Sequence, residues 1–143
     1  MFVDDQSTDF SYELAESYER RFPDKMAVLR AGTKRYAGGC RNIGIDYPVE
    51  CEYVYFIDSD DYLYSDISLR KIYDALNEKP DMLLIGWCQD INGKIFTNSK
   101  HCVFDPNSDN LASTIWSASW ARVTRRSVTM KFLENCMRAE DTY

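Results

Sequence analysis

The sequence predicts an α/β domain with a mainly parallel sheet, and three observations support that prediction. Short apolar runs alternate along the chain with segments of helical periodicity. Several of these runs are apolar on both faces, as are strands of a parallel sheet that helices cover. Acidic residues directly follow two of the runs, at the strand ends where α/β sheets gather their ligands. The predicted order is strand–helix–strand–helix–strand–helix–strand, followed by a hairpin.

The first half of the chain supplies four of these elements. The pattern predicts a strand stub at 1–3, a helix over 11–22, a short strand over 26–31 and a helix around 40–47. The helix over 11–22 carries apolar residues at helical spacing, and Pro23 ends it. The helix around 40–47 follows a flexible loop, because glycines are frequent between the two segments.

The second half begins with a buried strand and ends with less regular segments. The pattern predicts a strand over 52–58, a helix over 65–80, a strand over 81–87 and a hairpin over 90–96. Ser65 or Asp66 is expected to cap the helix, and the pair Asn92-Gly93 is a hairpin turn signal. Beyond these lie a predicted helix near 109–117, a strand over 119–124 and a final helical stretch over 130–143.

Composition restricts the class of protein. The chain has 143 residues, 45% hydrophobic and 28% charged, which suits one folded domain. Its net charge of −6 argues against a general nucleic-acid binder, which needs a basic face. The five cysteines form no CxxC pair and no secretory signal is visible, so we expect reduced thiols in the cytoplasm. No apolar run approaches the ~20 residues that cross a bilayer, and His101 has no second histidine with which to bind a metal.

An acidic cluster follows the strand over 52–58, in the stretch "YFIDSDDYL". Asp58, Asp60 and Asp61 repel one another unless a cation lies among them. The D-x-D pair suits a hard divalent cation, which takes oxygen ligands. The alternative is a solvated turn whose aspartates cap the next helix. An EF-hand loop is excluded, because Tyr62 and Leu63 stand where that loop needs an oxygen ligand and a glycine.

Four stretches, taken together and in order, resemble the family 2 glycosyltransferases of the GT-A fold, which use nucleotide-activated sugars. They are "VDDQSTD" (3–9), "GGCRNIGI" (38–45), "EYVYFIDSDD" (52–61) and "W…RV…R…KFLEN…EDTY" (120–143). The resemblance implies a GT-A-like (Rossmann-like) three-layer α/β domain, with residues 1–143 forming part of a catalytic domain. Gln6 stands where the family commonly has glycine. In the family a strand–helix–strand unit precedes the first stretch, so we expect an N-terminal truncation of about 35–40 residues.

The resemblance also implies roles for individual residues. The residues that it assigns to the nucleotide sugar are Asp4, Asp5, Arg41 and Asp58. Asp60 would hold Mn²⁺ or Mg²⁺, and Asp141 would be the catalytic base that takes the proton of the acceptor hydroxyl. Asp61 would lie outside the metal's ligands or cap a helix. The plainer alternatives are helix capping for Asp4 and Asp5, an ordinary surface position for Arg41, and an exposed acidic tail for Asp141.

The activity that the resemblance implies is an inverting, metal-assisted transfer of a sugar from a nucleotide-diphosphate sugar to a hydroxyl acceptor. The acceptor would be a glycan or a lipid-linked molecule in cell-surface polysaccharide or glycan synthesis. The expected location is the cytoplasm or the inner face of the membrane, and a homodimer is one way to cover an open sheet edge. Two alternatives remain: a metal-dependent nucleotidyltransferase, and a catalytically inactive remnant or interaction module.

Overall fold

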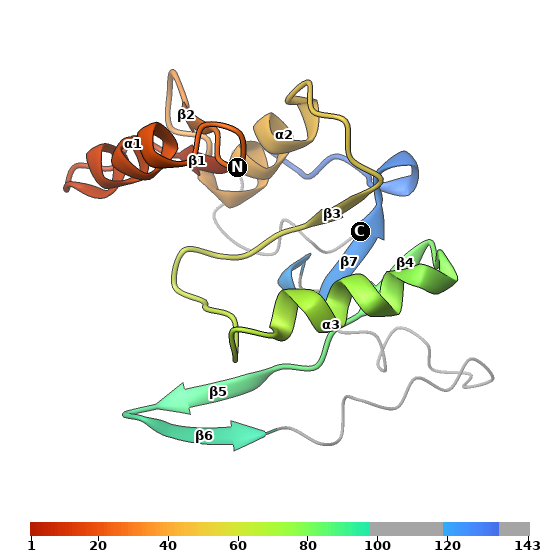
Figure 1. Ribbon diagram of the computed structural model, residues 1–143. Helices are drawn as coiled ribbons and strands as arrows, with labels where there is room; N and C mark the ends of the chain where they lie inside the picture. The colour runs from red at the N-terminus through yellow and green to blue at the C-terminus, as the bar shows by residue number, and fades with distance from the viewer. Residues whose placement is uncertain (98–118, 135–143) are drawn as a thin grey trace. The chain divides into compact units, whose positions relative to one another are not determined.

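The computed structural model describes residues 1–97 and 119–134, and it divides into two compact units (Figure 1). Unit 1 comprises residues 1–50 and 130–143, and unit 2 comprises residues 51–129. Each unit is described by itself. The predicted helix near 109–117, His101 and the predicted catalytic residue Asp141 lie outside the described residues.

Unit 1 repeats strand and helix twice. Its elements are β1 (Phe2–Asp4), α1 (Ser11–Arg21), β2 (Val28–Arg30) and α2 (Tyr36–Asp46). The strands β1 and β2 pair in parallel, with Phe2 opposite Val28 and Asp4 opposite Arg30. The helix predicted over 11–22 is confirmed as α1. The helix predicted around 40–47 begins earlier, at Tyr36, because the backbone at its start is held by a carboxylate described below.

Unit 2 is built on a three-stranded sheet. Its elements are β3 (Tyr53–Tyr55), α3 (Ser68–Ala75), η1 (Leu76–Glu78), β4 (Met82–Leu84), β5 (Cys88–Ile91), β6 (Lys94–Thr97), η3 (Ser119–Ala121), β7 (Arg122–Arg125) and η4 (Arg126–Val128). The strand order is β3–β7–β4, and β7 is antiparallel to both neighbours. It follows that β3 and β4 run parallel to each other. Val123 at the centre of this sheet is only 2% exposed, opposite Tyr55 on one side and Leu83 on the other.

The hairpin predicted from Asn92-Gly93 is confirmed. Strands β5 and β6 pair antiparallel, and Ile91 lies opposite Lys94 across the two-residue turn. Both turn residues have positive φ, 54° at Asn92 and 78° at Gly93. Such a turn requires this backbone conformation, which asparagine and glycine adopt most readily.

Three expectations differ from the structure. The sheet is parallel only in part, because among the described strands the directly paired parallel neighbours are β1 and β2. The helix predicted over 65–80 begins at Ser68 after Ile67, since the Ser65 N–H donates to the Ser68 Oγ at 3.0 Å and neither Ser65 nor Asp66 caps it. The helical stretch expected from Met130 is not helical over 130–134, where the backbone instead binds α2.

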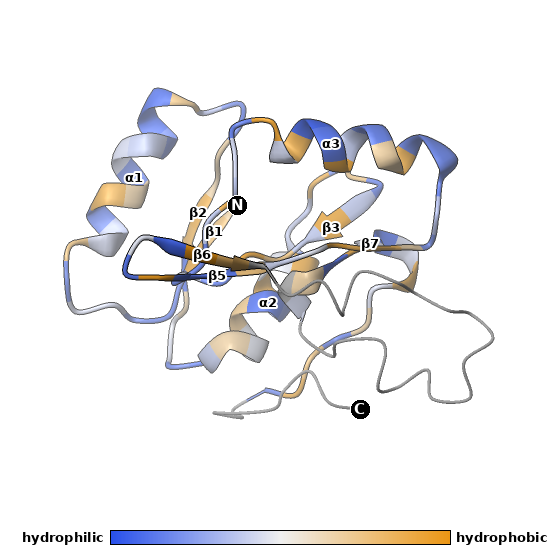
Figure 2. Cartoon of the chain, turned by 90° about the horizontal axis from the view of Figure 1, so that it is seen from below, coloured by the Kyte–Doolittle hydropathy of each residue, from blue (hydrophilic) through white to orange (hydrophobic). Residues whose placement is uncertain are grey.

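The helices are amphipathic and short. Hydrophobic and hydrophilic residues alternate along α1 and α3 in Figure 2, as surface helices of a globular protein require. Within the described ranges, none of the helices has the length and apolar character needed to span a membrane.

Candidate functional site

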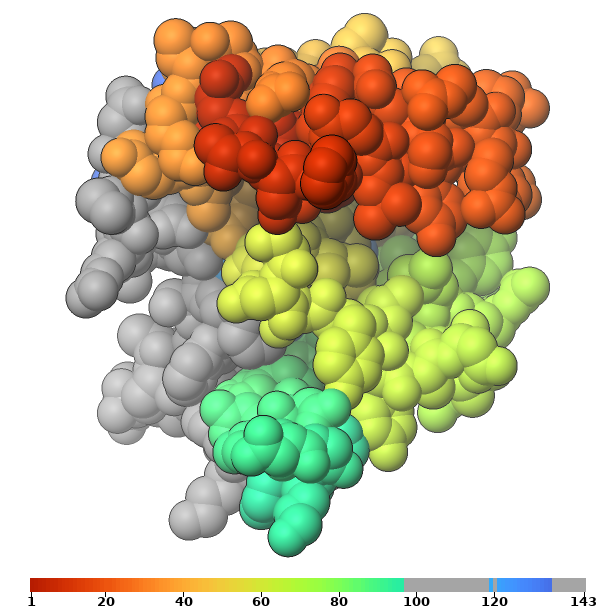
Figure 3. Space-filling view, turned by 90° about the vertical axis from the view of Figure 1, so that its left-hand side faces the viewer, coloured from red at the N-terminus to blue at the C-terminus, as the bar shows by residue number. Residues whose placement is uncertain are grey.

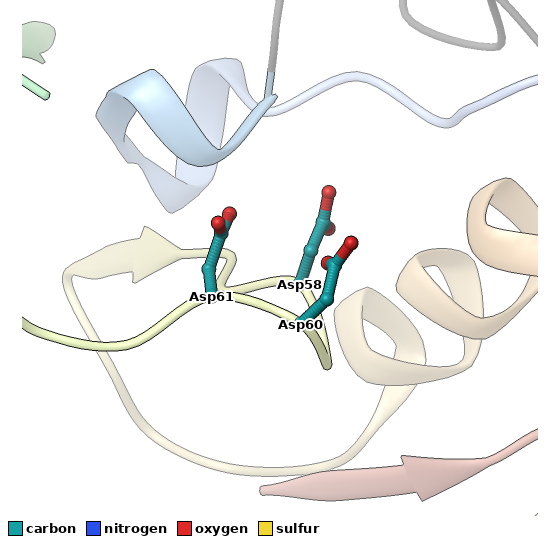
Figure 4. A group of neighbouring side chains, drawn as sticks. All are labelled: Asp58, Asp60 and Asp61. Carbon is teal, nitrogen blue, oxygen red and sulfur yellow. The ribbon is translucent and has the colours of Figure 1, made fainter. Parts of the chain in front are cut away.

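The acidic cluster lies in the loop that follows β3. Asp58, Asp60 and Asp61 each offer a carboxylate oxygen, and these oxygens lie within 4.8 Å of one another. The three carboxylates point to the same side of the loop (Figure 4). A turn brings them together, because the Asp61 N–H donates to the Asp58 carbonyl at 3.1 Å. Converging carboxylate oxygens are the ligands that Mg²⁺ and Mn²⁺ prefer.

Electrostatics in this cluster favour a cation. Burial, followed by the charges of Asp60 and Asp58, raises the pKa of Asp61. A divalent ion would remove the repulsion that raises this pKa. The expectation that Asp61 caps a helix is wrong, because the residue preceding α3 is Ile67. Asp61 instead lies beside Asp60, and both offer a carboxylate oxygen to the cluster.

A hollow of about 850 Å³ in unit 2 borders the acidic cluster. Asp60 and Asp61 line it together with Tyr62, Tyr64 and Trp87. The segments around it are the loop after β3, α3 and the β5–β6 hairpin, which appear in Figure 3 in yellow, light green and teal. Aromatic walls beside polar groups are typical of a site that binds polar rings.

One carboxylate links this hairpin to the loop of the acidic cluster. Asp90 accepts the Tyr62 hydroxyl at 2.6 Å with Oδ2 and the Gly93 N–H at 2.8 Å with Oδ1. The hydrogen bond to Asp90 is also the main cause that raises the pKa of Tyr62. Our sequence analysis missed this pair, because 28 residues separate its members and no local pattern joins them.

Asp4 is placed at the end of β1 with its side chain buried. The residue is 1% exposed, and its Oδ2 lies 3.1 Å from the Nε of Arg30. Its carboxylate also accepts the Ser7 N–H. The Arg30 guanidinium carbon also lies 4.8 Å from the centroid of the Tyr12 ring. A nucleotide contact by Asp4 stays a prediction.

Asp5 binds the start of α2. Its Oδ1 accepts the Arg35 N–H at 2.6 Å, and its Oδ2 accepts the Tyr36 N–H at 2.9 Å. Lys34 Nζ lies 3.1 Å from Oδ2. Burial raises the pKa of Asp5, but the hydrogen bonds from Arg35, Lys34 and Tyr36 outweigh it, so the net pKa is lowered. Asp5 therefore binds backbone amides at the start of α2 and does not cap α1, and its nucleoside contact stays a prediction.

The middle of α2 carries a buried pair of polar residues. Arg41 is 8% exposed, and its guanidinium carbon lies 5.2 Å from the centroid of the Phe132 ring. Asn42 is 5% exposed and hydrogen-bonds to the backbone of Phe132. The structure therefore places Arg41 in the interior rather than in the surface position weighed above. Sequence analysis missed Asn42, although it stands in the family stretch "GGCRNIGI".

The chain is similar to known proteins over most of its length. Residues 1–136 match the model of the family described as Glycosyl transferase family 2. A poly(ribitol-phosphate) beta-glucosyltransferase of Bacillus spizizenii is 31% identical to this chain over 113 residues, which cover 79% of this chain. The same alignment covers 18% of that relative, so this chain corresponds to a small part of its length.

Proposed function

We propose a function from one premise: the chain belongs to glycosyl transferase family 2. The family has a GT-A, Rossmann-like α/β fold, with which the alternating strands and helices agree. The reaction that we assign is transfer of a sugar from a nucleotide-diphosphate sugar to a hydroxyl acceptor. The single observation that carries this proposal is the convergence of three carboxylates beside a hollow in unit 2.

The carboxylates would hold a divalent cation. We assign Asp60 as a direct ligand of Mn²⁺ or Mg²⁺, with Asp61 close enough to share it. When bound, the ion would offset the negative charge that builds on the departing nucleoside diphosphate. Asp58 is half-buried at the base of the cluster, where it can accept a hydroxyl of the ribose or of the sugar. The hollow beside Tyr62 and Trp87 would receive a sugar ring.

The nucleoside would lie near the end of β1. Asp5 already gathers Lys34 and the backbone amides at the start of α2, and its carboxylate can accept a base N–H or a ribose hydroxyl. Asp4 would support this end of β1 through Arg30. Arg41 lies against the Phe132 ring, and we assign its guanidinium to a base or a phosphate of the donor.

Transfer itself requires a base on the acceptor side. We assign this role to Asp141, which would take the acceptor's proton while the hydroxyl oxygen attacks the anomeric carbon with inversion. The relative named above is a poly(ribitol-phosphate) beta-glucosyltransferase. We therefore propose a hydroxyl of a cell-surface polymer or its lipid-linked precursor as the acceptor, with the reaction on the cytoplasmic side.

Calorimetry with UDP tests the donor site. We expect wild-type protein to bind UDP in the presence of Mn²⁺, and Asp60→Ala to lose this Mn²⁺-dependent heat. Asp74→Ala, which removes an exposed aspartate from α3, is the matched control and should bind as wild type. Absence of heat from well-folded wild-type protein would instead favour an inactive remnant.

Product analysis tests the reaction class. A glycosyltransferase releases a nucleoside diphosphate from its donor, whereas a nucleotidyltransferase releases pyrophosphate. We expect UDP from UDP-glucose. Release of pyrophosphate during sugar-nucleotide synthesis would overturn the assignment.

A further inference from the structure

We propose that Asn42 is a positioning residue for transfer: it holds Lys131–Glu134, the docked segment, against α2. The functional part of this inference rests on the proposed function, because the docked segment leads into the stretch that carries Asp141. The docking itself rests on described residues of unit 1 alone.

Asn42 binds both backbone groups of a single residue. Its Oδ1 accepts the Phe132 N–H at 2.8 Å, and its Nδ2 donates to the Phe132 carbonyl at 2.9 Å. The same Nδ2 lies 3.3 Å from Oε1 of Glu134. One side-chain amide thus does what a neighbouring β-strand would do for that residue. Because Asn42 is buried, release of the segment would leave its amide without these partners, which is costly.

Neighbouring residues of α2 hold the same segment. Arg41 stacks on the Phe132 ring, so that residue is bound through its side chain as well as its backbone. Arg35 Nη1 donates to Oε2 of Glu134 at 2.9 Å. Gly39 leaves room for the Arg35 side chain, since a Cβ at this glycine would lie 2.7 Å from the Cβ of Arg35.

Arg35 connects this docking to the proposed nucleoside site. Its backbone N–H donates to Asp5, while its guanidinium donates to Glu134. Arg35 therefore contacts Asp5, which we assign to the donor, and also contacts the docked segment, which leads to the proposed base Asp141. Asn42 is the buried member of this arrangement and Arg35 the more exposed one.

Docking shortens the stretch of chain that carries Asp141. It holds the chain at Glu134, which is seven residues before Asp141 in the sequence. If the segment were released, the preceding anchor would be Thr129, which hydrogen-bonds to Thr124 and Arg125. Thr129 is twelve residues before Asp141, so the tether of Asp141 would lengthen from seven residues to twelve. Because effective concentration falls roughly as the −3/2 power of tether length, it would drop about twofold.

Three variants test the contribution of the Asn42 side chain to docking. Asn42→Ala removes both hydrogen bonds to Phe132, and Asn42→Asp replaces the donor by a charge beside Glu134. Asn42→Asp combined with Glu134→Gln removes that repulsion and offers the new carboxylate an amide donor, so it should rescue part of the loss. Asp46→Asn is the matched control, because it breaks the exposed ion pair of Asp46 with Lys131 on the same segment.

Hydrogen exchange tests the docking without any activity. We expect the amides of 130–134 to exchange faster in Asn42→Ala and Asn42→Asp, to recover in part in the double variant, and to match wild type in Asp46→Asn. Circular dichroism checks that each variant is folded. Unchanged exchange in folded Asn42→Ala would overturn the docking, and equal acceleration in Asp46→Asn would overturn the specific role of Asn42.

Kinetics and a distance measurement test the positioning. With UDP-glucose and Mn²⁺ we expect kcat to fall at least about twofold in Asn42→Ala while KM stays unchanged. Faster exchange with unchanged kcat would overturn the role. If wild type turns over no donor, the proposed function fails, and spin labels at Glu50 and Thr142 decide the inference. A broader distance distribution in Asn42→Ala supports it, and an identical one overturns it.

Discussion

Arg125 on β7 lies directly opposite Tyr53 on β3, and its guanidinium carbon lies 5.2 Å from the centroid of the Tyr53 ring. The same guanidinium donates to Glu52 at 2.7 Å and to Asp81 at 3.0 Å. One side chain of the middle strand thus binds residues next to both outer strands, β3 and β4. Arginine suits this position, because its planar fork donates in several directions and stacks on aromatic faces.

The first prediction concerns the stability of this sheet. Arg125→Ala should lower the free energy of unfolding, because it removes the ion pairs that join Arg125 to Glu52 and Asp81. Arg125→Lys should lose about half as much, since lysine keeps the charge without the fork. Urea unfolding measures both. Arg70→Ala on the exposed face of α3 is the control, and an equal loss there would contradict the role of Arg125.

The second prediction concerns Asp61 and pH. Its pKa is raised in the folded state, so protonated Asp61 stabilises the protein below the ordinary pKa of 3.8, and this stabilisation is lost as pH rises through the folded pKa. Asp61→Asn should therefore stabilise metal-free protein at pH 7, by no more than about 1 kcal/mol because exposed charges are screened. It should also weaken Mn²⁺ binding.

Thermal unfolding at two pH values measures this effect. Mn²⁺ should raise the melting temperature of wild type more at pH 7 than at pH 4, because protons compete for the same oxygens. Asp74→Asn should behave as wild type. A melting temperature that Mn²⁺ leaves unchanged at pH 7 would argue against a metal site at this cluster.

The third prediction concerns thiol reactivity. Burial, followed by the charge of Asp5, raises the pKa of Cys40 to about 11, so about one molecule in a thousand carries its thiolate at pH 8. Cys51 is exposed. Iodoacetamide at pH 8 should therefore label Cys51 well before Cys40, as peptide mass spectrometry can measure.

A variant separates the two causes at Cys40. Asp5→Asn removes the nearby charge and should lower the pKa of Cys40, but the thiol should stay slow because burial is the larger cause. Labelling of Cys40 at the rate of Cys51 in wild type would show that the thiol is not buried as described.

The fourth prediction concerns the link between Tyr62 and Asp90. Tyr62→Phe removes the hydroxyl that donates to Asp90 and should leave the loop of the acidic cluster less ordered. Binding of UDP with Mn²⁺ should therefore weaken by about two- to threefold, because a hydrogen bond between exposed groups adds little net free energy. Calorimetry measures it. Tyr64→Phe removes a hydroxyl from the same loop as control, and a similar loss in both would contradict the specific link.

The sequence predicted local features well and distant contacts poorly. Helix α1, the turn at Asn92-Gly93 and the run that becomes β3 follow from periodicity and turn chemistry over a few neighbouring residues. A strand was also predicted over 119–124, where the structure has η3 followed by β7, but the place of β7 between β3 and β4 was not predicted. Antiparallel pairing with Tyr53 and Met82 is decided across many residues of chain, about which a local pattern says nothing.

The site shows the same division. The clustering of Asp58, Asp60 and Asp61 could be predicted, because the three residues are close neighbours in the sequence. In contrast, Asp5 reaches Tyr36 across 31 residues and Asn42 reaches Phe132 across 90. The contact between Asp5 and Tyr36 explains why α2 begins earlier than predicted. Glycines near the N-terminus of α2 are poor helix formers, so the local sequence does not indicate this start.

Asn42 binds the backbone N–H and carbonyl of Phe132, so these hydrogen bonds do not depend on which side chain occupies position 132. A saturation library should therefore tolerate many substitutions there, especially to other rings that Arg41 can stack on, but not proline, which has no N–H. Position 42 should tolerate almost no substitution, because the side chain there must both donate to and accept from the backbone of Phe132. Over evolutionary time the two partners of one contact would then change at very different rates, and covariation between them would be weak.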